Sequence, residues 1–125
     1  MEFACVFPLF FALVAGSLEG GRFVVSRMML SYAVSVGARA ATLSTASTGS
    51  VQAAVVNAAP MLHLTSTQVE VTSASGMPPT VGTNVTVSIG VVSAANKYTF
   101  KSLIPKYFSP FTTRSWSAQA TMVAR

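Results

Sequence analysis

The first part of the chain is almost entirely apolar. Residues 3–18 read FACVFPLFFALVAGSL and carry no charge. A helix that crosses the hydrocarbon core of a bilayer needs about 20 apolar residues, so this run alone is short. Continuing it through Glu19-Gly20-Gly21-Arg22 to Val25 supplies the missing length. Glu19 and Arg22 are three residues apart, so they share a helix face and can partly neutralise each other. The pattern predicts an N-terminal transmembrane helix.

Two other interpretations of this run remain. A cleaved secretory signal normally begins with basic residues and ends at small ones. Here Met1-Glu2 supplies an acid at the start, although Ala15-Gly16-Ser17 resembles a weak cleavage site. A buried core helix of a soluble protein would fit less well with so many phenylalanines. We therefore expect a retained anchor.

A helical pattern continues beyond the apolar run. Polar side chains recur every four residues, and apolar ones recur at spacings of three and four. The polar stripe is Arg27, Ser31, Ser35 and Arg39, and the apolar stripe is Val25, Met29, Tyr32, Val36, Ala40 and Leu43. This predicts an amphipathic helix whose apolar stripe faces a core. An unbroken helix over residues 2–43 would be roughly 60 Å long, about twice the hydrocarbon thickness, with a kink expected at Pro8.

The rest of the chain predicts a small domain of mixed structure. Residues 50–59 form a short predicted helix before Pro60. Residues 68–72 and 84–89 alternate polar and apolar side chains and predict two half-buried strands joined by a turn-rich segment. Two prolines predict a loop over residues 97–111. Residues 112–123 predict a third, antiparallel strand, with one face formed by Trp116, Ala118, Ala120 and Met122.

We thus predict an α+β fold in which a long N-terminal helix, half transmembrane and half amphipathic, packs on a small three-stranded antiparallel sheet. Residues 1–43 would form the anchor and spine helix, and residues 44–125 the α+β head.

Composition supports an association with lipid or with other subunits. Only 9% of the residues are charged and 51% are hydrophobic, whereas a soluble domain is about a quarter charged. The net charge is +5, but the basic residues are scattered, so no groove for nucleic acid is predicted. Anionic lipid headgroups are a candidate partner for the basic residues near the anchor.

Side chains that could carry out chemistry are sparse. His63 is the single histidine, Cys5 the single cysteine, and there is no aspartate. A Ser–His–Asp triad or an ordinary structural zinc site therefore cannot be assembled, and no glycine-rich phosphate loop follows a strand. We expect no catalytic residue, metal, cofactor or small-molecule substrate, and hence no enzyme.

The residues that stand out are those beside the anchor. An acid in or next to an apolar span costs several kcal/mol unless it is paired or reaches water. Glu2 either lies outside the lipid at the chain end or meets a positive group of a neighbouring subunit. Glu19 and Arg22 are expected to form an intrahelical pair at the interface. With Pro8, these are the candidate anchor and subunit-assembly residues.

The order of these motifs resembles the TadE-like proteins of bacterial tight-adherence pilus systems. Residues 2–9 read EFACVFPL, residues 19–22 EGGR and residues 32–39 YAVSVGAR. They are similar to the family's E-F-A-L-V-x-P-L start, E-x-G-R element and A-x-x-G-A-R ending. The resemblance implies a pilin-like version of this α+β fold, and a minor pilin or pseudopilin that is cut by a prepilin peptidase before the anchor. Glu2 matches the family's acid that follows the processing site and would pair with a neighbouring subunit's N-terminus.

The resemblance also implies a location and partners. The protein would sit in the bacterial inner membrane with its head outside the cytoplasm, and its partners would be other pilin subunits, the pilus assembly machinery and membrane lipid. In the family a basic leader precedes this acid, whereas Met1 alone precedes it here, so we expect a leader further upstream. Such a leader would outweigh Arg22, Arg27 and Arg39 in setting the orientation. The rival hypothesis is a single-span membrane protein whose head binds a ligand or regulates a partner without any fibre.

Overall fold

The computed structural model describes residues 2–91, 93–101 and 115–125, and only the backbone of residues 2–5 and 94. Two α-helices, three short 3-10 helices and five strands follow one another along the described chain. They are α1 (Glu2–Ala41), α2 (Thr48–Ala58), η1 (Pro60–Leu62), η2 (Ser66–Gln68), β1 (Val69–Ser73), β2 (Asn84–Ile89), η3 (Ala94–Asn96), β3 (Tyr98–Thr99), β4 (Ser115–Trp116) and β5 (Ala118–Val123).

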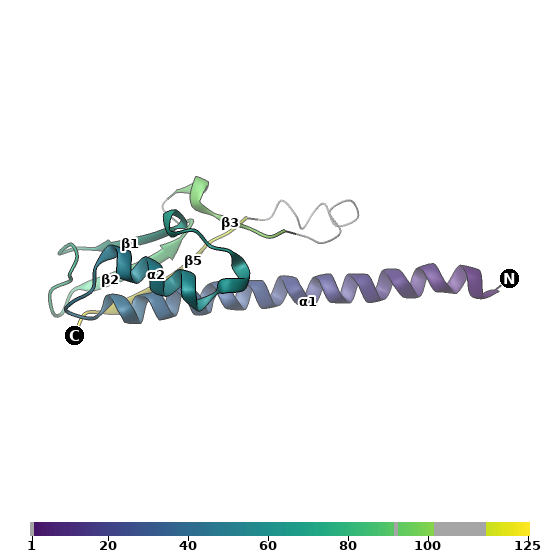
Figure 1. Ribbon diagram of the computed structural model, residues 1–125, viewed down its shortest axis with the longest axis horizontal. Helices are drawn as coiled ribbons and strands as arrows, with labels where there is room; N and C mark the ends of the chain where they lie inside the picture. The colour runs from purple at the N-terminus through teal and green to yellow at the C-terminus, as the bar shows by residue number, and fades with distance from the viewer. Residues whose placement is uncertain (1, 92, 102–114) are drawn as a thin grey trace.

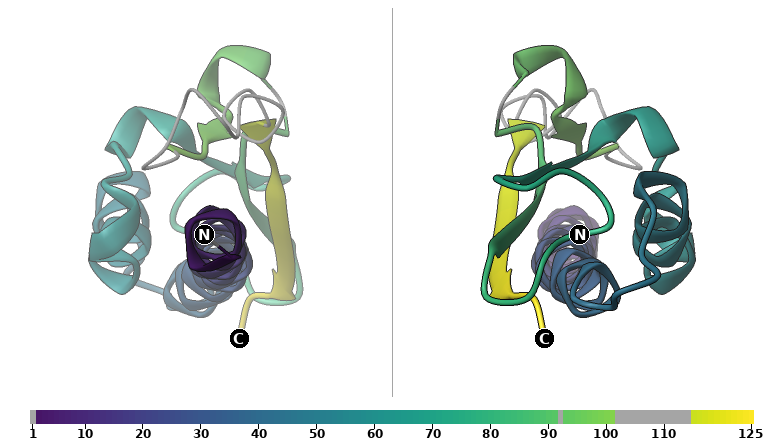
Figure 2. Two further views of the ribbon diagram at one scale, coloured as in Figure 1. Left: turned by 90° about the vertical axis from the view of Figure 1, so that its right-hand side faces the viewer. Right: turned by 90° about the vertical axis from the view of Figure 1, so that its left-hand side faces the viewer.

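Helix α1 is much longer than the domain that it supports. Its N-terminal half extends away from the head, and its C-terminal half is enclosed by α2 on one side and the sheet on the other (Figures 1 and 2). The 40 residues correspond to about 60 Å at 1.5 Å per residue. Pro8 lies inside the helix, which runs through it uninterrupted. The predicted long helix is present and ends at Ala41, two residues before Leu43.

The face that α1 turns to the core differs from the predicted stripe. The buried residues are Leu30, Ala33, Val34, Ala38 and Ala41, which also recur at spacings of three and four. Of the predicted stripe, Val25, Tyr32 and Leu43 are 48%, 60% and 59% exposed, so the assignment was wrong for these three, whereas Met29 packs against the core. Both stripes satisfy helical periodicity. The real contact combines Leu30 and Val34 with alanines, which let α2 and the sheet approach α1 closely. The predicted polar stripe is correct for Arg27, Ser31 and Arg39, which are exposed.

Helix α2 begins at a capping box. The Ser50 amide donates to the Ser47 hydroxyl oxygen (3.2 Å), and the Ser47 amide donates to the Ser50 hydroxyl oxygen (3.0 Å). This satisfies two backbone donors that the first turn would leave unpaired. Val51 and Val55 then point into the core. The short helix predicted over residues 50–59 is confirmed, with its start two residues earlier.

The three-stranded sheet is antiparallel and has the order β1-β2-β5. Val87 of the central strand lies opposite Val71 of β1 and Ala120 of β5. Alternate residues Val85, Val87 and Ile89 are fully buried, as expected for strands with one face on a helix. The predicted α+β fold is therefore confirmed. The division at residues 43 and 44 stays a prediction.

A second, two-stranded sheet was not predicted. Strands β3 and β4 pair antiparallel, with Tyr98 opposite Trp116. The predicted loop was therefore wrong at Tyr98–Thr99, while residues 102–111 lie outside the described residues, as do residues 112–114 of the predicted tail strand. Within the tail, the alternation is correct: Trp116, Ala118, Ala120 and Met122 are half-buried, and the residues between them are exposed.

Gly37 gives a direct test of the core contact. A Cβ at this position would overlap the side chain of Val55 and lie 3.3 Å from Val87 Cγ1. We expect Gly37→Ala to lower the free energy of unfolding of the head by about 1 kcal/mol, because overpacking costs about 1–3 kcal/mol and exceeds the gain of about 1 kcal/mol in helix propensity. Urea unfolding in nonionic micelles, followed by Trp116 fluorescence, measures this. Gly49→Ala in α2 is the control, because no atom lies within 4 Å of its added Cβ; equal behaviour of both variants would contradict the packing.

Candidate functional site: the anchor and the base of the head

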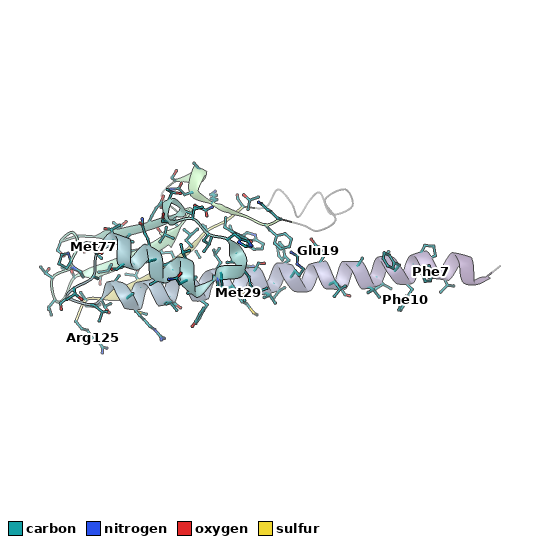
Figure 3. The ribbon with its side chains drawn as sticks, in the orientation of Figure 1. Phe7, Phe10, Glu19, Met29, Met77 and Arg125 are labelled. Carbon is teal, nitrogen blue, oxygen red and sulfur yellow. The ribbon has the colours of Figure 1, made fainter. Side chains whose placement is uncertain are left out.

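The N-terminal half of α1 exposes its largest side chains. The exposed residues include Val6, Phe7, Leu9, Phe10, Phe11, Leu13 and Leu18. Figure 3 shows two of them, Phe7 and Phe10, on the part of the helix that extends from the head. Within Val6–Ala41, the most apolar window has a mean hydropathy of 1.4, and only 6% of it is buried. A core helix of a soluble protein would be mostly buried, so that interpretation does not fit. The helix is long and apolar enough to cross a membrane.

One hydroxyl within the apolar half is satisfied inside the helix. Ser17 Oγ donates to the Val14 carbonyl oxygen at 2.9 Å. In hydrocarbon a free hydroxyl would be costly, and such a bond to the preceding turn removes that cost. Ser17 is therefore compatible with lipid on all sides of the helix.

An exposed apolar seam runs onto the head half of α1 from the anchor, whose other faces are also exposed and apolar. Its members alternate at spacings of four and three and face away from the buried residues of α1. They are Phe7, Phe11, Val14, Leu18, Gly21, Val25, Met28 and Tyr32, all exposed. This 3.5-residue period is the one that pairs helices in coiled coils. Val25 and Tyr32, which were predicted to face the head's core, are thus part of a longer exposed seam.

Glu19 and Arg22 form the expected ion pair. Arg22 Nη1 donates to Glu19 Oε2 at 3.3 Å. Glu19 is only 4% exposed and lies eleven residues, about three turns, before Leu30, hence on the side of α1 that faces the head. The Arg22 side chain is 46% exposed. The pair therefore holds a nearly buried carboxylate at the point where the helix leaves the head.

Three aromatic side chains gather next to this pair. Phe23 meets Trp116 edge to face, with ring centroids 4.5 Å apart, and Phe100 with centroids 5.6 Å apart. Trp116 also stacks on Phe100 at 5.9 Å, and the Arg22 guanidinium lies 5.9 Å from the Phe100 ring centroid. The cluster joins α1 to the small β3–β4 sheet. Sequence reasoning missed it because its members are far apart in the chain and lack a common period.

The hydroxyl group of Tyr98 at this site has a raised pKa. Burial raises the pKa of the Tyr98 hydroxyl above its usual value of 10.0. A hydrogen bond with the Ser26 side chain and the nearby positive charge of Arg22 partly oppose this effect. Tyr98 therefore keeps its proton throughout the physiological range and serves as a neutral hydrogen-bonding group.

The candidate anchor residues are distributed along α1 and do not meet at one point. Glu2 begins the helix, but its side chain lies outside the described residues. Pro8 is exposed on the apolar half, and Glu19 and Arg22 lie together at the base of the head. Their anchor and assembly roles stay predictions. Within residues 2–91, 93–101 and 115–125, no three side chains of the His, Cys, Asp or Glu type come close enough to hold a metal ion.

A double-mutant cycle tests the energetic weight of the ion pair. We expect Glu19→Gln and Arg22→Gln to be less than additive in the free energy of unfolding, with a coupling of about 1 kcal/mol, because one partner is buried and the other partly solvated. Urea unfolding in micelles supplies the four values. The matched cycle of Glu19→Gln with Arg27→Gln should be additive. Coupling of equal size in both cycles would mean that the overall charge, rather than the pair, is being measured.

The pKa of Tyr98 predicts a dependence on high pH. Because its pKa is higher in the folded state than in the unfolded state, its stabilising contribution is complete below pH 10 and is lost as the pH rises through the folded-state pKa. We expect the free energy of unfolding to fall less steeply above pH 10 in Tyr98→Phe than in the original protein. Urea unfolding between pH 8 and about 11 measures the slopes, while absorbance at tyrosinate wavelengths follows the remaining tyrosines. Identical slopes would contradict the burial.

Comparison with known proteins agrees with the motifs in α1. Searches of curated proteins and of solved structures found no match. A family model described as TadE-like protein matches residues 1–39, which cover the apolar run, the Glu19–Arg22 pair and the start of the packed helix. Over these residues the chain is similar to the TadE-like family, as its motifs predicted.

Proposed function

We propose that this protein is a membrane-anchored minor pilin or pseudopilin that helps to assemble a tight-adherence pilus or a related secretion system. The observation that carries the proposal is the continuous exposed seam of α1, Phe7 to Tyr32, within the segment that matches the TadE-like family model. A fibre subunit needs one surface that is stable in lipid before assembly and against other helices afterwards. Exposed apolar side chains at coiled-coil spacing meet both needs.

The seam extends further than a membrane anchor requires. About 20 apolar residues suffice to span the hydrocarbon core, and residues 3–25 already provide that length. Met28 and Tyr32 lie beyond them and yet are exposed at 66% and 60%. Monomeric soluble surfaces rarely keep such a row of large apolar side chains open to water. A neighbouring helix that covers the row would explain its presence.

In this proposal the partners are other pilin subunits and the assembly machinery, and the protein starts in the bacterial inner membrane with its head outside the cytoplasm. Glu2 would meet a positive group of the next subunit, Pro8 would adjust the direction of the anchor, and Glu19 with Arg22 would keep the helix boundary neutral. The role is structural rather than catalytic. The exposed N-terminal half, the small head and the family match over residues 1–39 support this assignment.

Fibre incorporation tests the proposal. The tagged full chain is expressed in a bacterium that assembles tight-adherence pili, and membranes and sheared fibres are probed with antibody. We expect the protein in both fractions. Met28→Glu and Tyr32→Glu, at the seam beyond the span, should leave it in membranes but lower its amount in fibres at least roughly tenfold, because a buried unpaired charge costs several kcal/mol. Ser31→Glu, on the polar face of the same helix, is the matched control.

Each alternative has its own result. A protein that stays in membranes and never enters fibres would support the single-span binding or regulatory head. A protein that loses its first residues up to Ser17 and appears in the soluble fraction, as judged by intact mass, would support the cleaved signal. Equal loss from fibres for Met28→Glu and Ser31→Glu would show that the seam has no special part.

A further inference from the structure

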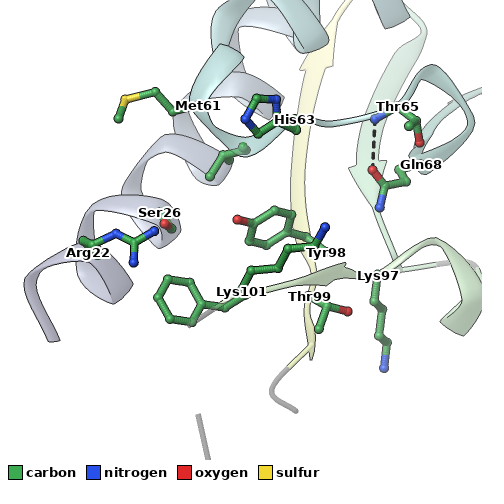
Figure 4. A pocket seen from close by; sticks show the side chains of 12 residues that line it. Arg22, Ser26, Met61, His63, Thr65, Gln68, Lys97, Tyr98, Thr99 and Lys101 are labelled. Carbon is green, nitrogen blue, oxygen red and sulfur yellow. Dashed lines mark hydrogen bonds between the residues drawn. The ribbon is translucent and has the colours of Figure 1, made fainter. Parts of the chain in front are cut away.

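The base of the head contains a basic cavity. It has a volume of about 410 Å³ and lies between α1, the turn after α2 and strand β3 (Figure 4). Three cationic side chains, Arg22, Lys97 and Lys101, line it, together with the hydroxyl groups of Ser26 and Tyr98. No carboxylate is among its described lining residues. Glu19 offsets part of the Arg22 charge, but the two lysines leave a net positive cavity with neutral donors beside it.

An apolar groove adjoins this cavity. It has a volume of about 400 Å³ and shares Arg22, Ser26, Met61 and Leu62 with the basic cavity. Its other walls are residues of α1 from Ser17 to Met29, with Gly21 as the member that has no side chain. The groove therefore leads from the basic cavity down the helix, toward the apolar half of α1. A polar and an apolar compartment are joined at Arg22.

The position of the two compartments relative to the bilayer indicates the kind of ligand that they can bind. Arg22 follows the uncharged run of residues 3–18 by one turn, which places it at the level of lipid headgroups when that run lies in the hydrocarbon core. Cationic side chains at this level attract anionic headgroups. The groove extends from there in the direction of the acyl chains. A molecule with a negative head and an apolar tail, oriented as in a bilayer leaflet, matches this arrangement.

We propose that this two-part cleft binds one anionic phospholipid, with its phosphate between Arg22, Lys97 and Lys101 and one acyl chain along Met61, Gly21 and Leu18. The Tyr98 hydroxyl, which stays hydrogen-bonded to Ser26, donates one neutral hydrogen bond to the headgroup. The inference needs the anchor to lie in lipid but does not depend on a role in a pilus. One wall of the groove, Leu18 and Val25, belongs to the seam, so a neighbouring helix and the lipid compete for it. The occupant in the separate subunit is the lipid.

The binding test uses the full chain in nonionic micelles, at a concentration where sedimentation shows one chain per micelle. Trp116 is the only tryptophan, and it contacts Phe100 and Tyr98, both of which line the cavity. Its fluorescence is followed during titration with three probes: dihexanoyl phosphatidylglycerol, dihexanoyl phosphatidylcholine and glycerol phosphate. We expect phosphatidylglycerol to bind at least tenfold more tightly than either of the others, since only it has both the charge and the tail.

Two pairs of variants separate the compartments. Lys97→Gln with Lys101→Gln should abolish the preference for phosphatidylglycerol over phosphatidylcholine. The control, Arg39→Gln with Arg125→Gln, removes the same charge from two exposed positions, one in the last turn of α1 and one at the far end of the head (Arg125, Figure 3), and should leave the preference intact. Gly21→Leu should fill the groove and weaken phosphatidylglycerol binding at least tenfold. Gly20→Leu adds the same side chain outside the groove, where space is also open, and should have no effect.

Several results would overturn the proposal. Equal affinity for the two phospholipids would exclude recognition of the anionic head. Glycerol phosphate binding as tightly as phosphatidylglycerol would identify a site for free phosphate esters instead. If Gly21→Leu changes self-association in the micelle but leaves the lipid affinity unchanged, the groove is the binding surface for a second copy of the chain. Fibre incorporation is measured independently, so its failure would not affect these outcomes.

Discussion

The structure depends on one continuous helix that must suit two surroundings. Helix α1 (Glu2–Ala41) keeps large apolar side chains exposed in its first half and buries Leu30, Val34 and several alanines in its second half. Bilayer hydrocarbon can cover the first half because all backbone groups of a helix are paired internally. The second half has to fit between α2 and the sheet, where Ala33, Gly37 and Ala38 allow close approach. Any change in helix register would disturb both halves at once.

Polar and aromatic side chains gather at the base of the head, where the exposed half of α1 meets the packed half. Glu19 is nearly buried and Arg22 partly exposed, and their 3.3 Å contact keeps that boundary close to neutral. The ring cluster of Phe23, Phe100 and Trp116 fixes the small β3–β4 sheet against α1 immediately beyond the pair. The head is therefore held to the helix at the membrane-proximal end as well as through its core. This attachment gives the proposed lipid cleft defined walls.

Much of the fold could be predicted because its signals are local. Two-residue alternation identified β2 over Asn84–Ile89, and Pro60 marked the end of α2. The choice of core face on α1 failed, since two apolar stripes share the helical period and only tertiary contacts distinguish them. Spacing alone placed Val25 and Tyr32 on the core face, whereas the core takes Leu30, Ala33, Val34 and Ala38 at the same spacing. The pairing of Tyr98 with Trp116 and the basic cavity depend on contacts between distant segments, which no local pattern contains.

The exposed seam and the apolar groove share side chains, and this affects how the protein could assemble. Leu18 and Val25 belong both to the seam and to the wall of the apolar groove, so a helix packed there excludes the lipid from the same side chains. Apolar contact with a neighbouring helix differs little from apolar contact with acyl chains. Replacing the lipid by a helix therefore changes the free energy little at these residues. Beyond the bilayer the balance changes, because Met28 and Tyr32 face water until a neighbour covers them. In the proposed assembly, the hydrophobic drive to associate therefore resides in the segment of α1 next to the head, and the lipid-embedded segment aligns the subunits.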